Sequence, residues 1–229
     1  MLFRSKTCVP QTYGASTSWN YEVGFKGEFL DRRFSVDTSI YYIDWRDLQV
    51  QVQSPTNVGY TANAGAAKSE GVEFSAESRP LLGMTVSSWI TYDDAALTEA
   101  FPPTSSTYGV PGNRLPYASR WSGHVSFQQE FPVTGQVSAL LGGDASYVGN
   151  SWGILTGSNG MAAPRSLYPG YAKVDLLAGI NYASWSAKLF VTNLTDRRAT
   201  IGGGDGDYPP FAYQYITPRT VGLTVVKTF

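Results

Sequence analysis

The chain ends on the stretch Pro218-Arg-Thr-Val-Gly-Leu-Thr-Val-Val-Lys-Thr-Phe229, in which apolar residues alternate with small or polar ones. Side chains of a β-strand point to alternate faces, so this stretch predicts one apolar and one polar face. The apolar face carries Val221, Leu223, Val225 and Phe229, and the other carries Thr220, Gly222, Thr224 and Thr228. Lys227 and Val226 depart from the pattern. A terminal strand of this kind favours a transmembrane β-barrel, although the last strand of a soluble sandwich can alternate in the same way.

The composition favours a barrel over a helical membrane protein or a nucleic-acid binder. A net charge of −1 over 229 residues gives no reason to expect nucleic acid as a partner. Charged residues make up 15% of the chain, fewer than in most soluble domains, and aromatic residues make up 14%. Apolar stretches are far shorter than the ~20 residues of a membrane helix. One lipid-facing and one wet face would account for this composition.

Cysteine and histidine occur once each, as Cys8 and His124. An internal disulfide is therefore impossible, and most metal sites built from these residues are excluded. We predict no metal site and no cofactor. The first ten residues lack the apolar core of a secretory signal, which an outer-membrane protein requires. Either the barrel interpretation is wrong, or Met1 is not the natural start of the full protein.

Alternation along the chain predicts nine strands with unequal connections. The predicted strands cover residues 19–29, 34–52, 67–78, 84–93, 120–131, 135–148, 170–182, 185–193 and the final stretch to Phe229. Short connections at 30–33, 79–83, 132–134 and 183–184 alternate with long ones at 53–66, 94–118, 149–169 and 194–217. Outer-membrane barrels have short periplasmic turns and long extracellular loops. We therefore expect all the long loops at one end of the sheet.

The same alternation predicts which side chains face lipid. The expected lipid-facing set is Val72, Phe74, Val125, Phe127, Val174, Leu176, Val221, Leu223 and Val225. The expected lumen-facing set is Glu73, Glu77, His124, Asp144 and Asp175. Aromatic residues near strand ends are typical of the membrane–water interface, and Trp19, Tyr42, Trp121 and Tyr182 have such positions.

Five segments resemble, in order, the C-terminal part of TonB-dependent outer-membrane receptors. They are Asn20–Gly27 (NYEVGFKG), Tyr42–Gln49 (YIDWRDLQ), Asn63–Glu73 (NAGAAKSEGVE), Gly112–Trp121 (GNRLPYASRW) and Asn193–Asp196 (NLTD). Ser119 stands where the family usually has proline. Each motif alone is weak, but five in the family's order over nearly the whole chain are specific.

The resemblance implies a barrel of about 22 strands around an N-terminal plug. Nine strands cannot close into an antiparallel barrel, and a bacterial single-chain barrel has an even number. We therefore expect an all-β, antiparallel, partial transmembrane barrel, the C-terminal piece of a longer receptor. We divide the chain into a loop remnant, 1–17, and the C-terminal part of the barrel, 18–229.

The resemblance also implies a function, which is energy-coupled uptake of a scarce ligand, such as a ferric siderophore, across the bacterial outer membrane. The implied partners are outer-membrane lipid, the small ligand, TonB acting through a plug absent from these residues, and the barrel-assembly machinery, with Phe229 as assembly signal. A passive porin-like channel is the alternative. An enzyme is not expected.

Three groups of residues are candidates for a site. Aromatic residues of the long loops are able to grip a planar ligand, although some of them belong instead to the aromatic girdle at the membrane interface: Tyr108, Trp152, Tyr208, Phe211, Tyr213 and Tyr215. His124 lies between Ser122 and Ser126 on a polar face, as in a Ser–His pair, but no orienting acid is visible, and a lumen-lining role is the simpler interpretation. Asp205 and Asp207 supply two carboxylates in a Gly-rich loop, too few for a cation site by themselves.

Overall fold

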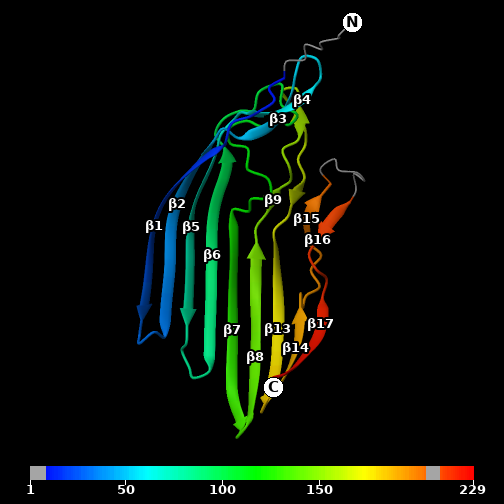
Figure 1. Cartoon of the computed structure of the whole chain (residues 1–229). Coiled ribbons are helices and arrows are strands. Elements are labelled where there is room, and N and C mark those ends of the chain that lie inside the picture. The colour runs from blue at the N-terminus through cyan, green and yellow to red at the C-terminus, as the bar shows by residue number, and fades with distance from the viewer. Residues whose placement is uncertain (1–8, 205–211) are drawn as a thin grey trace.

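The computed structural model describes residues 9–204 and 212–229, which form one large antiparallel sheet with small hairpins at one end (Figure 1). The sheet has nine strands in the order β1-β2-β5-β6-β7-β8-β13-β14-β17. Their bounds are β1 Thr17–Phe29, β2 Phe34–Arg46, β5 Ala67–Ser78, β6 Met84–Leu97, β7 Trp121–Thr134, β8 Val137–Val148, β13 Tyr171–Tyr182, β14 Trp185–Thr192 and β17 Thr220–Lys227. This is the predicted set of nine strands.

No helix in the described part of the chain is both long and apolar enough to span a membrane.

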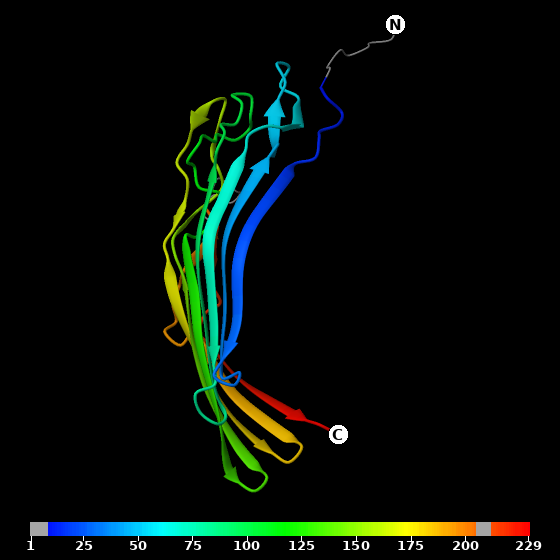
Figure 2. The same cartoon turned by 90° about the vertical axis from the view of Figure 1, so that its left-hand side faces the viewer.

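The sheet is curved and open. Each strand pairs with the strand that precedes it in the sheet order, so β1 and β17 are its two edges. Both edges curve toward the same side, which makes one face concave and the other convex (Figure 2). The prediction of a partial barrel is confirmed.

The four long connections lie at one end of the sheet and the four short turns at the other (Figure 1), as predicted. Three of the long connections, those after β2, β8 and β14, carry two-stranded hairpins of their own. These pair β3 (Gln49–Gln53) with β4 (Gly59–Asn63), β9 (Ser151–Trp152) with β12 (Leu167–Tyr168), β10 (Gly157–Ser158) with β11 (Met161–Ala162), and β15 (Thr200–Gly203) with β16 (Tyr213–Tyr215).

The predicted strand 34–52 was wrong at its C-terminal end. β2 ends at Arg46, and Asp47 takes a φ of 56°, which breaks the extended chain. The alternating residues that follow belong to β3 and face a small loop core. That core contains Leu48, Val50, Val52, Ala67, Leu97 and Leu155. A period of two describes a soluble hairpin over such a core as well as it describes a membrane strand.

Two further boundaries differ from the prediction by three or more residues. β6 continues to Leu97, four residues beyond the expected end, because its last residues pair with the start of β5 (Ala67↔Leu97). β7 continues to Thr134 across the expected turn at 132–134, with a register shift between Pro132 and Thr134. Both differences lengthen strands and leave the topology unchanged.

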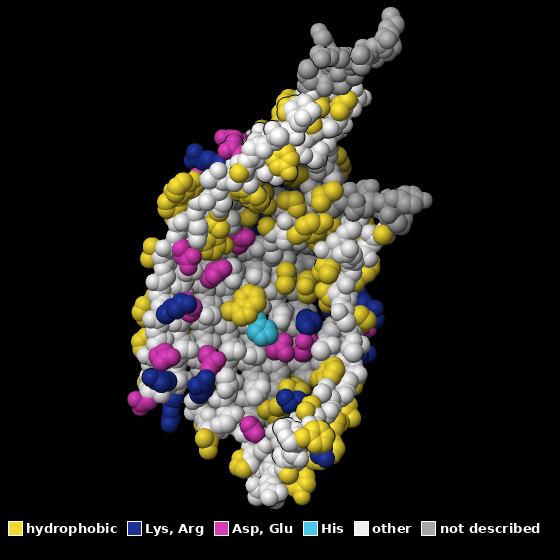
Figure 3. Space-filling model, in the orientation of Figure 1, with side chains coloured by type: hydrophobic (Ala, Val, Ile, Leu, Met, Phe, Trp, Pro, Cys, Tyr) yellow, Lys and Arg dark blue, Asp and Glu magenta, His cyan; other side chains and the backbone are white. Residues whose placement is uncertain are grey.

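Cross-strand register separates the two predicted faces. His124 is opposite Trp89 and Ser146, and Asp144 is opposite Ser126 and Asp175, so the lumen set shares one face. The concave face, which Figure 3 shows, carries the charged side chains of this set. The residues of the lipid set alternate with these and face the opposite, convex side. From Trp121 to Phe131, β7 spans roughly 33 Å of strand, and a strand tilted by ~40° crosses an apolar band of ~25 Å over that length.

Phe190 is the residue of strand 185–193 that did not fit the predicted alternation. The structure places it on the concave face, opposite Gly222 of β17. A Cβ atom at position 222 would collide with the Phe190 ring. A large ring on the polar face is therefore accommodated by a glycine on the neighbouring strand.

Candidate functional site

The concave face is a polar wall built by cross-strand register. One row crosses seven strands as Lys26, Asp37, Ser75, Trp89, His124, Ser146 and Lys173. The next row toward the short turns is Glu28, Ser35, Glu77, Ser87, Ser126, Asp144 and Asp175. Hydroxyl and charged groups dominate both rows. Such a wall suits water or a polar occupant and does not suit hydrocarbon.

Trp89 interrupts this polar wall. Its ring lies against the His124 imidazole, with ring centroids 6.3 Å apart and planes at 20°. The Trp89 side chain remains 43% exposed, facing the concave space. In the sequence, Trp89 is an aromatic residue on the polar face of its strand, between Ser87 and Thr91, and it was not among the predicted site residues. This position on the polar face was the signal in the sequence that could have assigned Trp89 to the concave wall.

His124 has two polar neighbours on β8. Its Nδ1 atom is 3.0 Å from the Ser146 hydroxyl and 3.9 Å from an Asp144 oxygen. In a Ser–His–Asp triad, the serine and the acid contact opposite ring nitrogens. Here both approach Nδ1. The serine that bonds with His124 is Ser146, and neither Ser122 nor Ser126 takes this place. The Ser126 hydroxyl bonds instead with that of Ser87 at 2.7 Å. This geometry is that of a hydrogen-bonded lumen residue.

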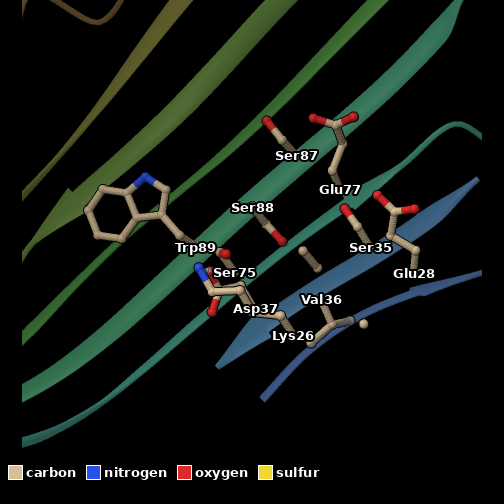
Figure 4. A pocket seen from close by; sticks show the side chains of 12 residues that line it. Lys26, Glu28, Ser35, Val36, Asp37, Ser75, Glu77, Ser87, Ser88 and Trp89 are labelled. Carbon is tan, nitrogen blue, oxygen red and sulfur yellow. Dashed lines mark ion pairs between the residues drawn. The ribbon is translucent and has the colours of Figure 1, made fainter. Parts of the chain in front are cut away.

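A hollow of about 530 Å³ lies beside Trp89, over β1, β2, β5 and β6 (Figure 4). Its lining includes Glu28, Glu77 and the ion pair between Lys26 Nζ and Asp37 Oδ2, 2.9 Å apart. The side chains of this pair are largely exposed, so the pair adds little stability. The hollow is open to the concave space.

A second hollow, of about 440 Å³, lies where the wall meets the last long loop. The strands contribute Ser146, Val148, Tyr171, Lys173 and Thr192, and the loop contributes Asn193, Ile201, Tyr215, Ile216 and Thr217. We call this set the mouth pocket, because it lies at the long-loop end of the concave face. It combines two phenol rings, aliphatic side chains and hydroxyls. Its one lysine is already paired, with Lys173 Nζ 2.7 Å from Asp175 Oδ2.

Asn193 holds the base of the loop that covers the mouth pocket. Its side chain is 1% exposed, and its φ of 51° turns the chain out of β14. The Asn193 amide nitrogen Nδ2 donates to the carbonyls of Arg197 and Thr217, both at 2.9 Å. Its backbone N–H donates to Asp175 Oδ1 at 2.7 Å. The two ends of the loop are thus joined to each other and to the wall.

Asp196 closes the same turn. One of its oxygens accepts a hydrogen bond from the backbone N–H of Arg219 at 3.0 Å, and the other is 3.2 Å from an Arg198 guanidinium nitrogen. These two donors, the backbone one first, lower the pKa of the Asp196 carboxyl below its ordinary value. The first and last residues of the NLTD segment therefore both fasten residues 217–219. Sequence analysis found the motif but not this role.

The aromatic residues predicted for the site are distributed over three loops. Tyr213 and Tyr215 lie on β16 with their side chains about half exposed, and Tyr215 lines the mouth pocket. Trp152 lies on β9 under the Arg165 guanidinium, 5.9 Å from its ring centroid. Tyr108 lies against Gly157 in the hairpin β10–β11. Tyr208 and Phe211, and the acidic pair Asp205 and Asp207, lie outside the described residues.

Two loops are joined by an aromatic pair that sequence analysis missed. Tyr117 stacks on Tyr168 with centroids 6.0 Å apart and planes at 5°. The Tyr168 hydroxyl donates to the carbonyl of Gly203 at 2.7 Å, which links this pair to β15 beside the mouth pocket. Backbone pairing of short hairpins creates these contacts, and no local pattern in the sequence indicates them.

Arg114, in the GNRLP segment, is partly buried among the loops. Its guanidinium donates to the carbonyl of Ala118 at 2.7 Å, and its own carbonyl accepts from Arg165 at 3.0 Å. Burial, helped by nearby Arg120, lowers the pKa of the Arg114 guanidinium. These contacts give Arg114 a role in fixing the loops. Within residues 9–204 and 212–229, no group of three or more His, Cys, Asp or Glu side chains is placed to hold a metal ion.

A comparison with protein families and a comparison with curated proteins both find receptors similar to this chain. Residues 10–194 match the family described as TonB dependent receptor-like, beta-barrel. The chain is 28% identical over 179 residues to the metal-pseudopaline receptor CntO of Pseudomonas aeruginosa, an alignment covering 78% of this chain and 23% of that receptor. The chain therefore spans about a quarter of this curated relative.

Two solved structures show the same fold. The ferric yersiniabactin uptake receptor FyuA from Yersinia pestis gives a TM-score of 0.70 at 22% identity, over 93% of this chain and 30% of that one. The pyoverdine outer membrane receptor FpvA from P. aeruginosa PAO1, bound to pyoverdine, gives 0.69 at 19% identity, with the same two coverages, 93% and 30%. At these identities the likeness shows the fold alone.

Proposed function

Because the chain belongs to the TonB-dependent receptor β-barrel family, we propose that it is the C-terminal barrel part of a receptor that takes up a scarce ligand by energy coupling. Proteins of this family are located in the bacterial outer membrane, and we assign this chain the same location. The ligand is a ferric siderophore or a related metal chelate. The family and the fold are those of transport receptors, not of enzymes.

One observation supports the proposal most strongly. The match to the receptor family extends from residue 10 to 194 on a sheet whose concave face carries rows of polar side chains (Figure 3) and whose outward-facing residues include the apolar Val125, Phe127 and Leu223. The receptors CntO, FyuA and FpvA are named for metal-pseudopaline, ferric yersiniabactin and pyoverdine. A lumen wall with loops gathered at one end suits capture of such chelates from outside.

We propose that the long-loop aromatics contact the ligand: Tyr108, Trp152, Tyr208, Phe211, Tyr213 and Tyr215. Tyr215 has the best structural support, since it combines an exposed ring with a place in the mouth pocket. We divide the chain into a loop segment, 1–17, and the barrel part, 18–229. The proposed partners are outer-membrane lipid, the barrel-assembly machinery acting on Phe229, and TonB acting through a plug domain of the full receptor.

The test is an uptake assay in cells whose only copy of the receptor is the full protein containing this chain. Accumulation of radiolabelled metal-pseudopaline, ferric yersiniabactin and ferripyoverdine is measured with and without a protonophore. We expect one chelate to accumulate and the protonophore to abolish its accumulation. Uptake that survives the protonophore, together with swelling of liposomes in a small sugar, would instead identify a passive channel.

The contribution of the mouth pocket is tested in the same assay with Tyr215→Ala. Loss of one aromatic contact is expected to weaken ligand binding by about tenfold. Tyr182→Ala is the matched control, because Tyr182 is an outward-facing tyrosine at the short-turn end. Equal effects of the two substitutions would remove the mouth pocket from the ligand site.

A further inference from the structure

Lys227 is out of place on the convex face. It is the last residue of β17 and is directly opposite Trp185 of β14. Among the residues that the described strands direct outward in the short-turn half of the sheet, it alone carries a charge. Near the long loops, by contrast, outward charges occur as pairs such as Arg46 with Asp44 and Lys68 with Glu70.

Two aromatic rings hold the Lys227 amine. Its Nζ atom lies 5.1 Å from the Trp185 ring centroid and 4.9 Å from that of Phe229. A backbone hydrogen bond from Thr228 N–H to the carbonyl of Ser184, at 2.9 Å, keeps the end of the chain beside the β13–β14 turn. None of the acidic groups in the described residues comes within ion-pair distance of this amine. The rings orient the charge but do not neutralise it.

The surroundings place this amine at a membrane boundary. Tyr182 and Trp185 flank the same turn and have exposed, outward-facing rings. Aromatic residues of this kind lie at the level of lipid headgroups, and lysine side chains near them extend toward the polar phase. A charge is costly in mid-membrane and nearly free at the interface. A counter-charge available at that level is the phosphate of a phospholipid.

We propose that Lys227, Trp185 and Phe229 form a binding site for the phosphate of a phospholipid headgroup in the periplasmic leaflet. Anionic lipids such as phosphatidylglycerol are favoured, because they add a net negative charge near the amine. The inference rests on the proposed location of the chain in the outer membrane. It gives Lys227, the charged residue that departs from the alternation of the final strand, a function at the membrane surface.

The test uses the full receptor reconstituted in nanodiscs of phosphatidylcholine with a minor fraction of phosphatidylglycerol. Native mass spectrometry counts the phosphatidylglycerol molecules retained after gentle removal of bulk lipid. One lysine near an anionic surface predicts roughly fivefold enrichment over the bulk fraction. Lys227→Gln should abolish this enrichment and Lys227→Arg should keep it. Excess inorganic phosphate in the buffer should leave it unchanged, since the proposed ligand is membrane-bound.

Lys188→Gln is the matched control, because Lys188 lies on the neighbouring strand β14 but faces the concave side. It should retain the wild-type enrichment. Equal enrichment in wild type and Lys227→Gln, with both proteins inserted and active in chelate uptake, would overturn the lipid site and leave the receptor function intact. Failure of the wild-type protein to insert would instead contradict the proposed location.

Discussion

The side-chain amide of Asn193 donates a 2.9 Å hydrogen bond to the carbonyl of Thr217, 24 residues further along the chain. This bond joins the two ends of the last long loop immediately above β14 and β17. Because Asn193 is buried and its side chain also bonds with Arg197, the loop leaves the wall in a fixed direction. The position of Ile201 and Tyr215 in the mouth pocket depends on this joint.

Asn193→Ala should loosen the loop base at a cost of about 1–3 kcal/mol, the usual penalty for leaving buried partners unsatisfied. The measurement is the rate of tryptic cleavage after Arg197 and Arg198 in the folded receptor, which should rise. Asn193→Gly separates two causes, since glycine tolerates the φ of 51° but makes no side-chain bonds. If Asn193→Gly behaves like wild type, backbone conformation and not hydrogen bonding fixes the loop.

Asp196 predicts a pH dependence with a defined sign. Its folded-state pKa is lowered, by the Arg219 backbone N–H first and then by Arg198, so the ionised form stabilises the fold. This contribution is fully present above the unfolded pKa of ~3.9 and is lost as pH falls through the lower folded pKa. The melting-temperature difference between wild type and Asp196→Asn should therefore vanish in strong acid. A difference that is constant with pH would contradict this assignment.

Phe190 and Gly222 should behave as a coupled pair. Gly222→Val adds atoms where the Phe190 ring lies, and it should destabilise the folded barrel by about 1–3 kcal/mol. Removing the ring with Phe190→Ala should relieve most of that cost. Guanidinium unfolding of the two single variants and the double variant gives the coupling energy. Additive effects would show that the ring moves aside without strain.

The same substitution at two adjacent residues of β17 should cost very different amounts of folding free energy. Leu223 faces outward with 66% of its side chain exposed, and Thr224 faces the concave side. Leu223→Arg should cost roughly 2–4 kcal/mol if it lies near mid-membrane. Thr224→Arg introduces the same side chain into a wet lumen and should cost little. Reversible unfolding of the receptor from lipid bilayers measures both, and similar costs would contradict the assignment of faces.

Sequence patterns predicted the nine strands and their faces because lipid on one side and water on the other impose alternation on every crossing. The same period misled at Leu48, Val50 and Val52, where alternating residues cover a loop core instead of facing lipid. It also failed at Phe190, whose place depends on a glycine 32 positions away. Alternation reports a two-sided environment but does not identify the two sides.

The candidate site was less predictable than the fold. Tyr215 was found from its type and its place in a loop, but the mouth pocket also needs Tyr171 and Lys173 of β13, more than 40 residues distant in sequence. The Trp89–His124 stack and the Tyr117–Tyr168 pair arise from strand register and hairpin pairing. Such contacts depend on how separate segments meet, which a single sequence does not encode in any local pattern.

We propose that this sheet is a membrane barrel wall with lipid on its convex face and water on its concave face. Nitroxide labels at single cysteines along β7, placed at Val125, Ser126, Phe127 and Gln128 in a Cys8→Ser background, test it most directly. In the reconstituted receptor, dissolved oxygen should relax labels at Val125 and Phe127, and a water-soluble nickel chelate should relax those at Ser126 and Gln128. A uniform response, or the reverse alternation, would contradict the claim.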